Sequence, residues 1–373
     1  MSLDFRFAII SDLHITLPQT IWDHPGRFHL VEVSIPALNH ALDHLLQADI
    51  DFLLLPGDLT QHGEPANHQW LADRLSQMPF PVYVIPGNHD IPYNQSSERA
   101  IMPHDFPEFY RRFGYEGIDQ LYYCREILPG VQLIALNSND YEEDGRLVGR
   151  LDPEQLSWLE STLHQVRDQV VLVMIHHNVV EHLWGQSRHP WGQRYMISNA
   201  SLLLRMLRGA GVQLVFTGHL HIQNIATRRQ VFDITTGSLV SYPHPYRLVH
   251  FHQDAQERQH LQIETYRIPS VPDFPDLQHT SREWMAQHSS SPVIKFLTAP
   301  PIHLPHEQAA EIAPHLRYFW AQIAEGDAIL RFPHLPPRAR QVLEKLNRSS
   351  ILDPEIAVTS DNHTRLTLDP SLC

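Results

Sequence analysis

Residues 52–58 read Phe52-Leu-Leu-Leu-Pro-Gly-Asp58, which places an acidic side chain directly behind a short apolar run. Such a run is typical of a buried β-strand, and Gly57 permits a tight backbone turn after it. The Asp58 carboxylate is therefore expected at the end of a strand. Because α/β proteins bind ligands at this carboxyl edge of the sheet, the stretch predicts both a fold class and a site.

Four further apolar runs are followed by polar side chains in the same way. The runs and their polar residues are 7–10 with Asp12 and His14, 82–85 with Asn88 and His89, 170–175 with His176, and 214–216 with His219 and His221. Two of these pairs have the spacing i, i+2, which puts both side chains on one face of an extended segment. Five strand ends at one edge would bring carboxylate, amide and imidazole groups together.

This set of side chains meets the requirements of a centre with two metal ions. Such ions lie roughly 3.5–4 Å apart and need a ligand that bridges them. A carboxylate has two oxygens and can bridge, whereas a neutral imidazole cannot, so Asp58 is the candidate bridge. The chain has 27 histidines, and a single one is more often a surface or packing residue. Metal binding is favoured because five motifs occur in order, each behind an apolar run.

In their order along the chain and in their residue types, these motifs resemble those of the calcineurin-like metallophosphoesterase superfamily, over about residues 5–268. They are Asp12-x-His14, Gly57-Asp58, Gly87-Asn88-His89-Asp90, His176 and Gly218-His219-x-His221. The resemblance implies a four-layer α/β/β/α sandwich that holds two ions. It implies that the ligands of the first ion are Asp12, His14, Asp58 and His221. It implies that the ligands of the second ion are Asp58, Asn88, His176 and His219.

The resemblance also suggests roles for residues beside the ligands. His89 would be the catalytic histidine next to the substrate phosphate, where it protonates the leaving oxygen or stabilises its charge. Asp90, the second candidate catalytic residue, would orient His89 or cap the following turn. His177 adjoins a ligand on a strand and would point to the opposite face. His62 is a candidate substrate-binding residue, with a solvated loop histidine as the alternative.

The residues of individual segments favour one branch of the superfamily. Residues 57–64 and 149–159 resemble the bacterial cyclic-nucleotide-phosphodiesterase branch. Gln61 stands where purple acid phosphatases have a tyrosine ligand, and Gln61-His62 replaces the Asp-Arg pair of the Ser/Thr protein phosphatases. The segment 233–247 is similar to bacterial phosphoesterases of this type, and its Arg247 is a candidate substrate-binding cation.

Composition argues against several classes of protein. The net charge of −14 over 373 residues disfavours a nonspecific duplex-binding surface, which needs clustered Lys and Arg, so nucleic acid is not an expected partner. The chain has neither an apolar stretch of about 18 residues nor a basic-then-apolar leader. A membrane span and secretion are therefore not expected. Cys124 and Cys373 are the only cysteines, which excludes a disulfide scaffold and favours the cytoplasm.

Strand and helix patterns alternate through the first part of the chain, which predicts mixed α/β layers. Helices are expected at 34–48, at 200–208 with Asn199 as N-cap, and from Pro153 with Asp152 as N-cap. Three later runs have no helices between them and predict a second, more antiparallel sheet: 230–235, 248–251 and 261–267.

Three prolines between residues 269 and 275 indicate a linker. We therefore expect a metallophosphoesterase domain at 1–268 and a mostly helical C-terminal appendage at 269–373. The appendage carries no motif of the metal-ligand type and is expected to supply no ligand. Its apolar helix faces, which carry Trp284 and Trp320, need burial against the catalytic domain or a partner subunit, so a homo-oligomer is one expectation.

The sequence is interpreted as a binuclear-metal-dependent phosphoesterase that hydrolyses small phosphodiesters, cyclic nucleotides or similar, with a hydroxide held between the ions as nucleophile. Oxygen and imidazole ligands suit Mn, Fe or Zn. Diesters are expected over monoesters because no Arg or Lys lies in the loops 57–64 and 87–90 to hold the second charge. The alternatives are a phosphomonoesterase or nucleotidase, a nuclease of the same fold, and a non-catalytic scaffold.

Overall fold

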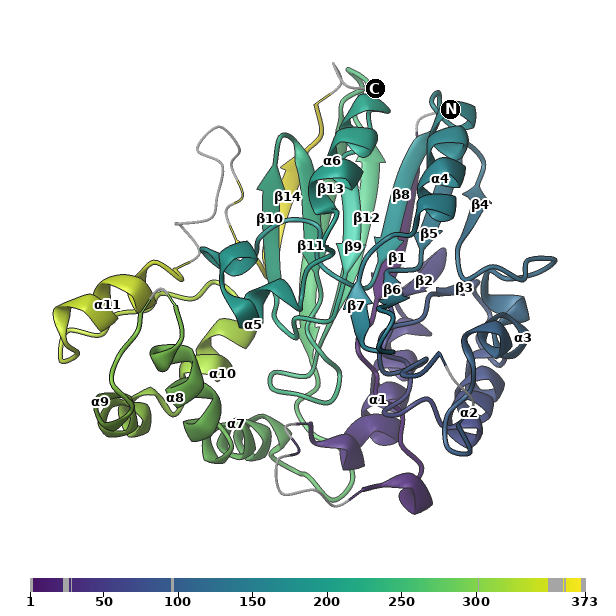
Figure 1. Cartoon of the computed structure of the whole chain (residues 1–373). Helices are drawn as coiled ribbons and strands as arrows, with labels where there is room; N and C mark the ends of the chain where they lie inside the picture. The colour runs from purple at the N-terminus through teal and green to yellow at the C-terminus, as the bar shows by residue number, and fades with distance from the viewer. Residues whose placement is uncertain are drawn as a thin grey trace.

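The computed structural model of the chain describes residues 3–22, 27, 29–94, 97–300, 302–347, 358 and 360–369. Two six-stranded sheets pack face to face, and helices cover their outer faces (Figure 1). This arrangement confirms the predicted four-layer α/β/β/α architecture. A small two-stranded sheet of β6 (Asn139–Tyr141) and β7 (Leu147–Gly149) accompanies the two large ones.

The first sheet has the strand order β14-β13-β12-β1-β2-β3. Its strands are β1 (Asp4–Ile9), β2 (Phe52–Leu55), β3 (Val82–Val84), β12 (Pro245–Gln253), β13 (Gln259–Arg267) and β14 (His363–Thr367). The strands β1, β2 and β3 run parallel, whereas β12 lies antiparallel to β1. The carboxyl ends of β1, β2 and β3 therefore share one edge of the sheet.

The second sheet has the strand order β10-β11-β9-β8-β5-β4. Its strands are β4 (Tyr123–Leu128), β5 (Val131–Leu136), β8 (Val170–Ile175), β9 (Leu214–Thr217), β10 (Asn224–Arg228) and β11 (Val231–Thr235). The central strands β5, β8, β9 and β11 are parallel, and only the two edge strands are antiparallel. The carboxyl ends of β8 and β9 supply the remaining sequence motifs.

The three late runs do not form one antiparallel sheet, and that prediction is wrong. The run at 230–235 becomes β11 and joins the second sheet in parallel with β9. The other two runs become β12 and β13, which extend the first sheet from β1. Alternation of side chains predicts that a run is a strand, but the partner strand is chosen by long-range packing.

Aromatic side chains join the two sheets. Phe7 of β1 stacks on Phe52 of β2 with ring centroids 4.9 Å apart, and its ring meets the edge of Phe216 of the second sheet at 5.4 Å. On the outer face of the second sheet, Val173 and Ile175 pack against the flanking helices, while the intervening Met174 faces the first sheet. The apolar core thus fills both the space between the sheets and the space under the helices.

The helices before the appendage are α1 (Ser34–Leu45), α2 (Pro65–Leu75), α3 (Phe106–Phe109), α4 (Pro153–Gln165), α5 (Pro190–Gln193) and α6 (Ala200–Gly209). The predicted cap of α4 is confirmed, because Asp152 Oδ1 accepts a hydrogen bond from Gln155 N at 2.8 Å. The predicted cap of α6 is wrong. The Asn199 side chain instead bonds the backbone of Leu151 through both of its polar atoms.

The C-terminal segment forms a helical cluster with its own apolar core. Its helices are α7 (Leu277–Gln287), α8 (Ser290–Thr298), α9 (His306–Ile312), α10 (Phe319–Ala324) and α11 (Pro337–Glu344). Leu297, Phe319 and Leu343 are buried in this core, so the helix faces that were expected to need a partner are largely packed within the chain. Among the helices of the described residues, none has both the length and the apolar character needed to span a membrane.

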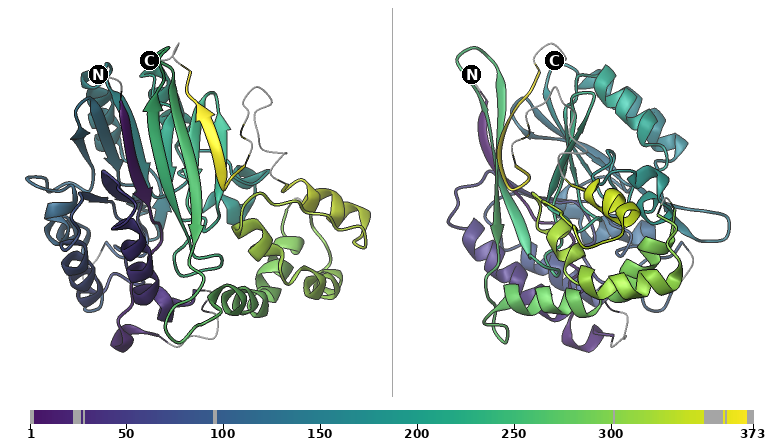
Figure 2. Two further views of the ribbon diagram at one scale, coloured as in Figure 1. Left: turned by 180° about the vertical axis from the view of Figure 1, so that it is seen from behind. Right: turned by 90° about the vertical axis from the view of Figure 1, so that its left-hand side faces the viewer.

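The chain returns from this helical cluster to the first sheet. Strand β14 pairs antiparallel with β13, with Leu366 opposite Leu261, and the two strands lie side by side in Figure 2. Its burial alternates, with Thr364 and Leu366 inward, which is the period of a half-buried strand. The C-terminal part is therefore not purely helical, and the boundary predicted at residue 268 does not separate the two parts cleanly.

Candidate metal centre and adjoining cavity

The polar motifs of the sequence meet where five parallel strands end. Asp12 and His14 follow β1, Asp58 follows β2, Asn88 follows β3, His176 follows β8, and His219 and His221 follow β9. Among the described residues, three groups of side chains bring potential ligand atoms within 4.8 Å of one another. Two of them contain a carboxylate: Asp12, His14, Asp58 and His221, and Asp58, His176 and His219; the other joins His29 to His14 and His221. Asp58 belongs to both groups that contain a carboxylate, as a bridging ligand must.

The first group directs several lone pairs at one point. His221 Nε2 lies 3.0 Å from Asp12 Oδ1 and 3.5 Å from His14 Nε2. His14 Nε2 also lies 3.8 Å from Asp58 Oδ2. Two imidazole nitrogens and two carboxylate oxygens that face each other at these distances fit a cation with nitrogen and oxygen ligands.

The second group uses the same oxygen of Asp58. Its Oδ2 lies 3.4 Å from His176 Nε2, and Asn88 Oδ1 lies 3.1 Å from that nitrogen. The other ring nitrogen of His176 donates to the carbonyl of Pro56 at 2.8 Å, which leaves Nε2 for an ion. His219 Nε2 lies 3.1 Å from the carbonyl oxygen of Arg194, which leaves Nδ1 on the side of Asp58.

The backbone at the ligands is strained. Five of them have φ between +44° and +65°: Asp12, His14, Asp58, His219 and His221. This left-handed region is uncommon for residues other than glycine, and such strain clusters at functional sites. The surrounding sheets hold these residues in place, because Asp12 N donates to the Gly57 carbonyl at 3.2 Å and His14 N to the Asp58 carbonyl at 2.9 Å.

The motif glycines are required by the close approach of neighbouring loops. A Cβ atom on Gly87 would lie 2.2 Å from Asp58 Oδ1, and one on Gly218 would lie 2.5 Å from Asp12 Oδ2. Neither distance is compatible with a side chain. Each glycine therefore makes room for a carboxylate of the candidate centre.

Burial and charge set the protonation states of the centre. Burial opposes the charge on Asp58, but His176 and His89 outweigh it and hold its pKa well below the usual range. Burial also opposes the cationic form of His176, yet the charge of Asp58 raises its pKa to about 9. Burial, with the nearby His29, lowers the pKa of His14. An unprotonated His14 beside an ionised Asp58 is the state that binds a metal ion.

The structure places His89 at the centre but assigns Asp90 a different contact. His89 Nδ1 donates to the Gln61 carbonyl at 2.6 Å, and its ring meets that of His14 at 4.7 Å. Asp90 is fully buried and accepts hydrogen bonds from backbone N–H groups of Leu59, Thr60 and Gly87. Asp90 thus fixes the loops that carry Asp58 and Asn88, and it does not orient His89 by direct contact.

His62 lies at the edge of the site. Its ring stacks on Trp22 with centroids 4.5 Å apart, and it lies 6.2 Å from the ring of His89. Burial, with His89 nearby, lowers its pKa to about 4, so its imidazole is neutral at pH 7. His62 is therefore a flat, uncharged group beside His89.

The expectation that Arg247 binds substrate is wrong. Its side chain has no exposed surface. The guanidinium donates to the carbonyls of Thr235 and Asp361 at 2.9 and 2.7 Å and to Thr265 Oγ1 at 3.2 Å. The backbone of Asp361 comes from the returning C-terminal segment, which sequence reasoning did not place there.

A cavity of about 480 Å³ opens beside the candidate ligands. Asp58, Asn88, His89 and His219 line one end, and the helical C-terminal segment lines much of the rest. Most of the cavity residues were not predicted from the sequence, among them four polar or aromatic ones near the candidate ligands: His29, Arg188, Arg194 and Tyr195. His29 stacks on His14 at 4.4 Å. None of the four follows an apolar run, so no strand-end pattern could have found them.

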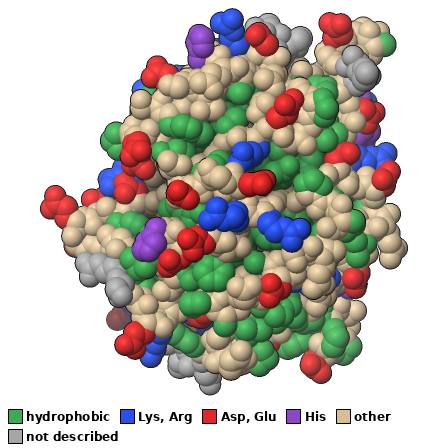
Figure 3. Space-filling model, turned by 90° about the vertical axis from the view of Figure 1, so that its right-hand side faces the viewer, with side chains coloured by type: hydrophobic (Ala, Val, Ile, Leu, Met, Phe, Trp, Pro, Cys, Tyr) green, Lys and Arg blue, Asp and Glu red, His purple; other side chains and the backbone are tan. Residues whose placement is uncertain are grey.

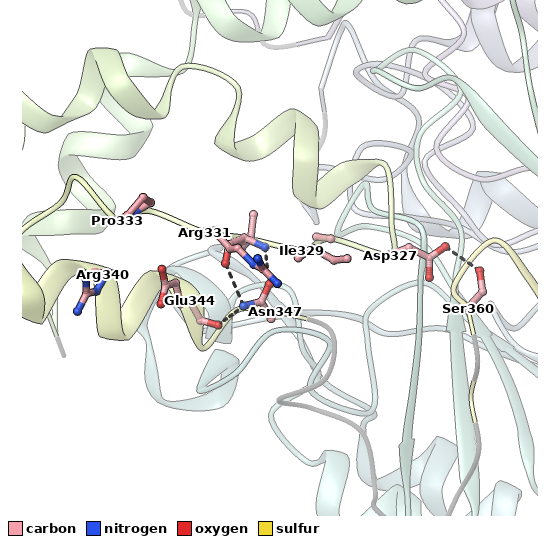
Figure 4. A pocket seen from close by; sticks show the side chains of 10 residues that line it. Asp327, Ile329, Arg331, Pro333, Arg340, Glu344, Asn347 and Ser360 are labelled. Carbon is pink, nitrogen blue, oxygen red and sulfur yellow. Dashed lines mark hydrogen bonds between the residues drawn. The ribbon is translucent and has the colours of Figure 1, made fainter.

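A second, wider hollow of about 1020 Å³ lies on the C-terminal segment, away from the candidate ligands (Figure 4). Several of its polar side chains hold the local fold. Ser360 Oγ donates to Asp327 Oδ2 at 2.7 Å, and Asn347 Nδ2 donates to the Leu330 carbonyl at 3.2 Å.

Comparisons with known proteins agree with this geometry. The sequence model of a family described as calcineurin-like phosphoesterase matches residues 5–223. A protein of Arcobacter nitrofigilis named Probable glycerophosphodiester phosphodiesterase GpdQ is 29% identical over 232 residues, which cover 61% of this chain and 76% of that protein. A protein of Synechococcus named as a probable cyclic nucleotide phosphodiesterase is 31% identical over 176 residues, or 47% of this chain and 59% of that protein.

Among solved structures, a dimetal phosphatase from Danio rerio superposes with a TM-score of 0.52 at 16% identity, covering 70% of this chain and 96% of that one. At this identity the likeness concerns the fold alone.

Proposed function

Because this chain belongs to the calcineurin-like phosphoesterase family, we propose that it hydrolyses phosphodiesters at a centre of two metal ions. One observation carries the proposal: Asp58 Oδ2 lies 3.8 Å from His14 Nε2 and 3.4 Å from His176 Nε2, so one carboxylate oxygen is shared by both groups. The proposed ligands are Asp12, His14, Asp58, Asn88, His176, His219 and His221.

The donor atoms narrow the choice of metal. Carboxylate, amide and imidazole groups without a thiolate suit Mn, Fe or Zn. Two such ions, when bound, neutralise phosphate charge and lower the pKa of a water between them.

His89 is proposed as the group that assists departure of the leaving oxygen. Its Nδ1 is held by the Gln61 carbonyl at 2.6 Å, and its backbone N donates to Asp58 Oδ1 at 2.8 Å. Both contacts fix the ring beside the bridging carboxylate and leave Nε2 for the substrate. Asp90 acts as a positioning residue, because it ties the loop of Asp58 to the loop of Asn88. His62 is proposed to contact substrate next to His89.

The preference for diesters is proposed mainly from the relatives, two of which are named as phosphodiesterases. Arg188 and Arg194 line the cavity and bring cations that the loops 57–64 and 87–90 did not indicate, so a shortage of cations no longer favours diesters over monoesters. Nucleic acid stays outside the proposal. On the face over α2 and α3, acidic and basic side chains are interspersed with hydrophobic ones (Figure 3), whereas duplex binding needs a basic surface. The cytoplasmic location and a homo-oligomer remain predictions.

Replacement of the bridging residue tests the proposal. Elemental analysis of the metal-loaded protein should find two ions per chain, and Asp58→Asn should lose both because the shared ligand loses its charge. Asp12→Asn is the matched control, since it should weaken the first ion more than the second. The loaded wild type should also turn over bis-nitrophenyl phosphate with a higher kcat/KM than nitrophenyl phosphate. One ion in the fully loaded wild type would refute the binuclear centre, and a preference for the monoester would favour the phosphatase alternative.

A further inference from the structure

The cavity beside the candidate ligands has an apolar wall that the C-terminal segment supplies. The side chains that this segment contributes include Met285, Phe296, Trp320, Ile323, Val342 and Leu346. The part of this chain that matches the family model ends at residue 223, before α7 begins. This wall therefore lies outside the residues that match the family model, and it lines the same cavity as His219 and His221.

Flat rings lie on both sides of the cavity. Phe296 and Trp320 belong to the wall and come from α8 and α10, and Trp184, Trp191 and Tyr195 come from the segment after β8, with Trp191 in α5. Phe296 and Trp320 meet edge to face with centroids 5.6 Å apart. Aromatic rings bind other aromatic rings by stacking and edge contacts, beyond the gain from apolar burial alone. The shape and composition of the wall thus favour a flat aromatic group over a flexible one.

The two sides of the cavity are joined by cations. The chain has only two lysines, Lys295 and Lys345, and both belong to the C-terminal segment. Lys345 Nζ lies 4.4 Å from the ring centroid of Trp184, and Lys295 Nζ lies 6.0 Å from that of Trp191. These cation–π contacts link the segment after β8, which includes α5, to α8 and to the residue that follows α11.

One donor within the wall has no protein acceptor. Trp320 Nε1 is buried without a hydrogen-bond partner among the described residues. A buried unpaired donor is costly. Because Nε1 has almost no accessible surface, the indole offers the cavity its aromatic surface and not this donor.

We propose that this cavity binds a flat aromatic ester group of the substrate, so that phosphodiesters with one aryl or heteroaryl group are the preferred class. The inference rests on the proposed function, because the phosphate must lie at the candidate metal centre for its ester group to reach the wall. Trp320 and Phe296 would then determine specificity, and the metal ligands would determine reactivity.

The test uses the metal-loaded, full-length protein and methyl monoesters of phosphonic acids. Their C–P bond resists hydrolysis, and product analysis after each titration checks that the remaining methyl ester bond is intact. Calorimetry compares the phenyl, cyclohexyl and ethyl phosphonates. Phenyl and cyclohexyl have the same number of carbons, so their difference reports flatness. We expect the phenyl phosphonate to bind about 3- to 10-fold more tightly than the cyclohexyl phosphonate, which is the range for aromatic pairs. It should bind at least about 10-fold more tightly than the ethyl phosphonate. Equal binding of phenyl and cyclohexyl, or of phenyl and ethyl, would overturn the proposal.

Substitutions assign the preference to the wall. Trp320→Ala should reduce the phenyl-to-ethyl ratio by about 5-fold or more. Trp158→Ala makes the same change on α4, where Trp158 packs on Tyr122, and should leave the ratio unchanged. An unchanged ratio in Trp320→Ala would contradict the assignment.

Failure of the proposed function is distinguishable from failure of this inference. If the loaded protein does not turn over bis-nitrophenyl phosphate but prefers the phenyl phosphonate, the proposed hydrolase activity is refuted and the aromatic subsite is supported. If the protein turns over bis-nitrophenyl phosphate but binds the phosphonates equally well, the hydrolase activity is supported and the aromatic subsite is refuted.

Discussion

At the residue scale, the candidate centre depends on glycines, because their lack of a side chain leaves room for the neighbouring carboxylates. Gly87 has no side chain, and this absence lets Asp58 approach from the adjacent loop. A Cβ atom there would lie 2.2 Å from both the backbone nitrogen and Oδ1 of Asp58. Even a change to alanine at such a position would displace the candidate ligand Asp58, although the new side chain is not itself a ligand.

We expect Gly87→Ala to displace Asp58 and to abolish stoichiometric metal binding, measured by elemental analysis of the loaded protein. Gly209→Ala is the matched control. Gly209 ends α6 and a Cβ there would meet nothing within 4 Å. The control should keep both ions and should be about 0.5–1 kcal/mol more stable. A Gly87→Ala protein that retains both ions would show that the loop can yield.

A second prediction concerns His89. His89→Ala should keep the metal ions, because His89 belongs to none of the groups of potential ligands. The value of kcat for a diester with a poor leaving group should fall by about 10²–10⁴-fold. With nitrophenolate as the leaving group the loss should be much smaller, because that group needs little protonation. Equal losses for both substrates would indicate that His89 holds the phosphate and does not assist the leaving oxygen.

The sequence predicted most of the candidate site because each ligand follows an apolar run. It failed at residues that only tertiary contacts bring together. Arg247 was assigned to substrate because of its place in a family-like segment, whereas its guanidinium is bonded to the carbonyl of Asp361, more than a hundred residues away. His29 and Arg194 follow no strand, and no local pattern distinguishes them from other loop residues.

At the element scale, β14 is one of the elements that the sequence analysis did not find. The strand has five residues and is separated from β13 by almost the whole helical segment. Short alternating runs of this kind carry a weak signal, and the described element that precedes it is the helix α11. Strand β8, with apolar residues throughout, was far easier to recognise.

We predict that Leu366→Asp detaches β14, because Leu366 is buried beside Leu261 and an unpaired charge there is costly. The free energy of unfolding should fall by about 2–5 kcal/mol, as for other severe core substitutions, measured by urea titration. Arg365→Asp is the control on the same strand, since Arg365 is exposed, and its effect should be within about 1 kcal/mol. Similar losses in both variants would mean that the strand does not bury Leu366 in solution.

At the scale of the whole molecule, buried histidines make stability depend on pH. Burial lowers the pKa of His244 to about 4, whereas an unfolded histidine titrates near 6.5. Between these values the unfolded chain binds more protons than the folded one. The free energy of unfolding therefore falls as the pH decreases from about 6.5 towards 4.

The variant His244→Asn tests this origin of acid sensitivity. Asparagine tolerates the left-handed backbone of this position, where φ is +53°, and its amide can replace the bond from Nδ1 to the Leu239 carbonyl. Between pH 7 and pH 5, metal-free His244→Asn should lose about 2 kcal/mol less stability than the metal-free wild type. Urea unfolding at both values gives the comparison. Equal losses would place the acid sensitivity elsewhere in the chain.

The return of the chain in β14 changes what the helical C-terminal segment is. The chain leaves β13 at Arg267 and re-enters the same sheet at His363, where Glu264 pairs with His363 and Thr265 N donates to the Asn362 carbonyl at 2.9 Å. The segment between them is thus the long connection of a β-hairpin and not a tail. A cassette of this kind can be exchanged between two fixed points, so that a new cavity wall could be installed over an unaltered set of metal ligands.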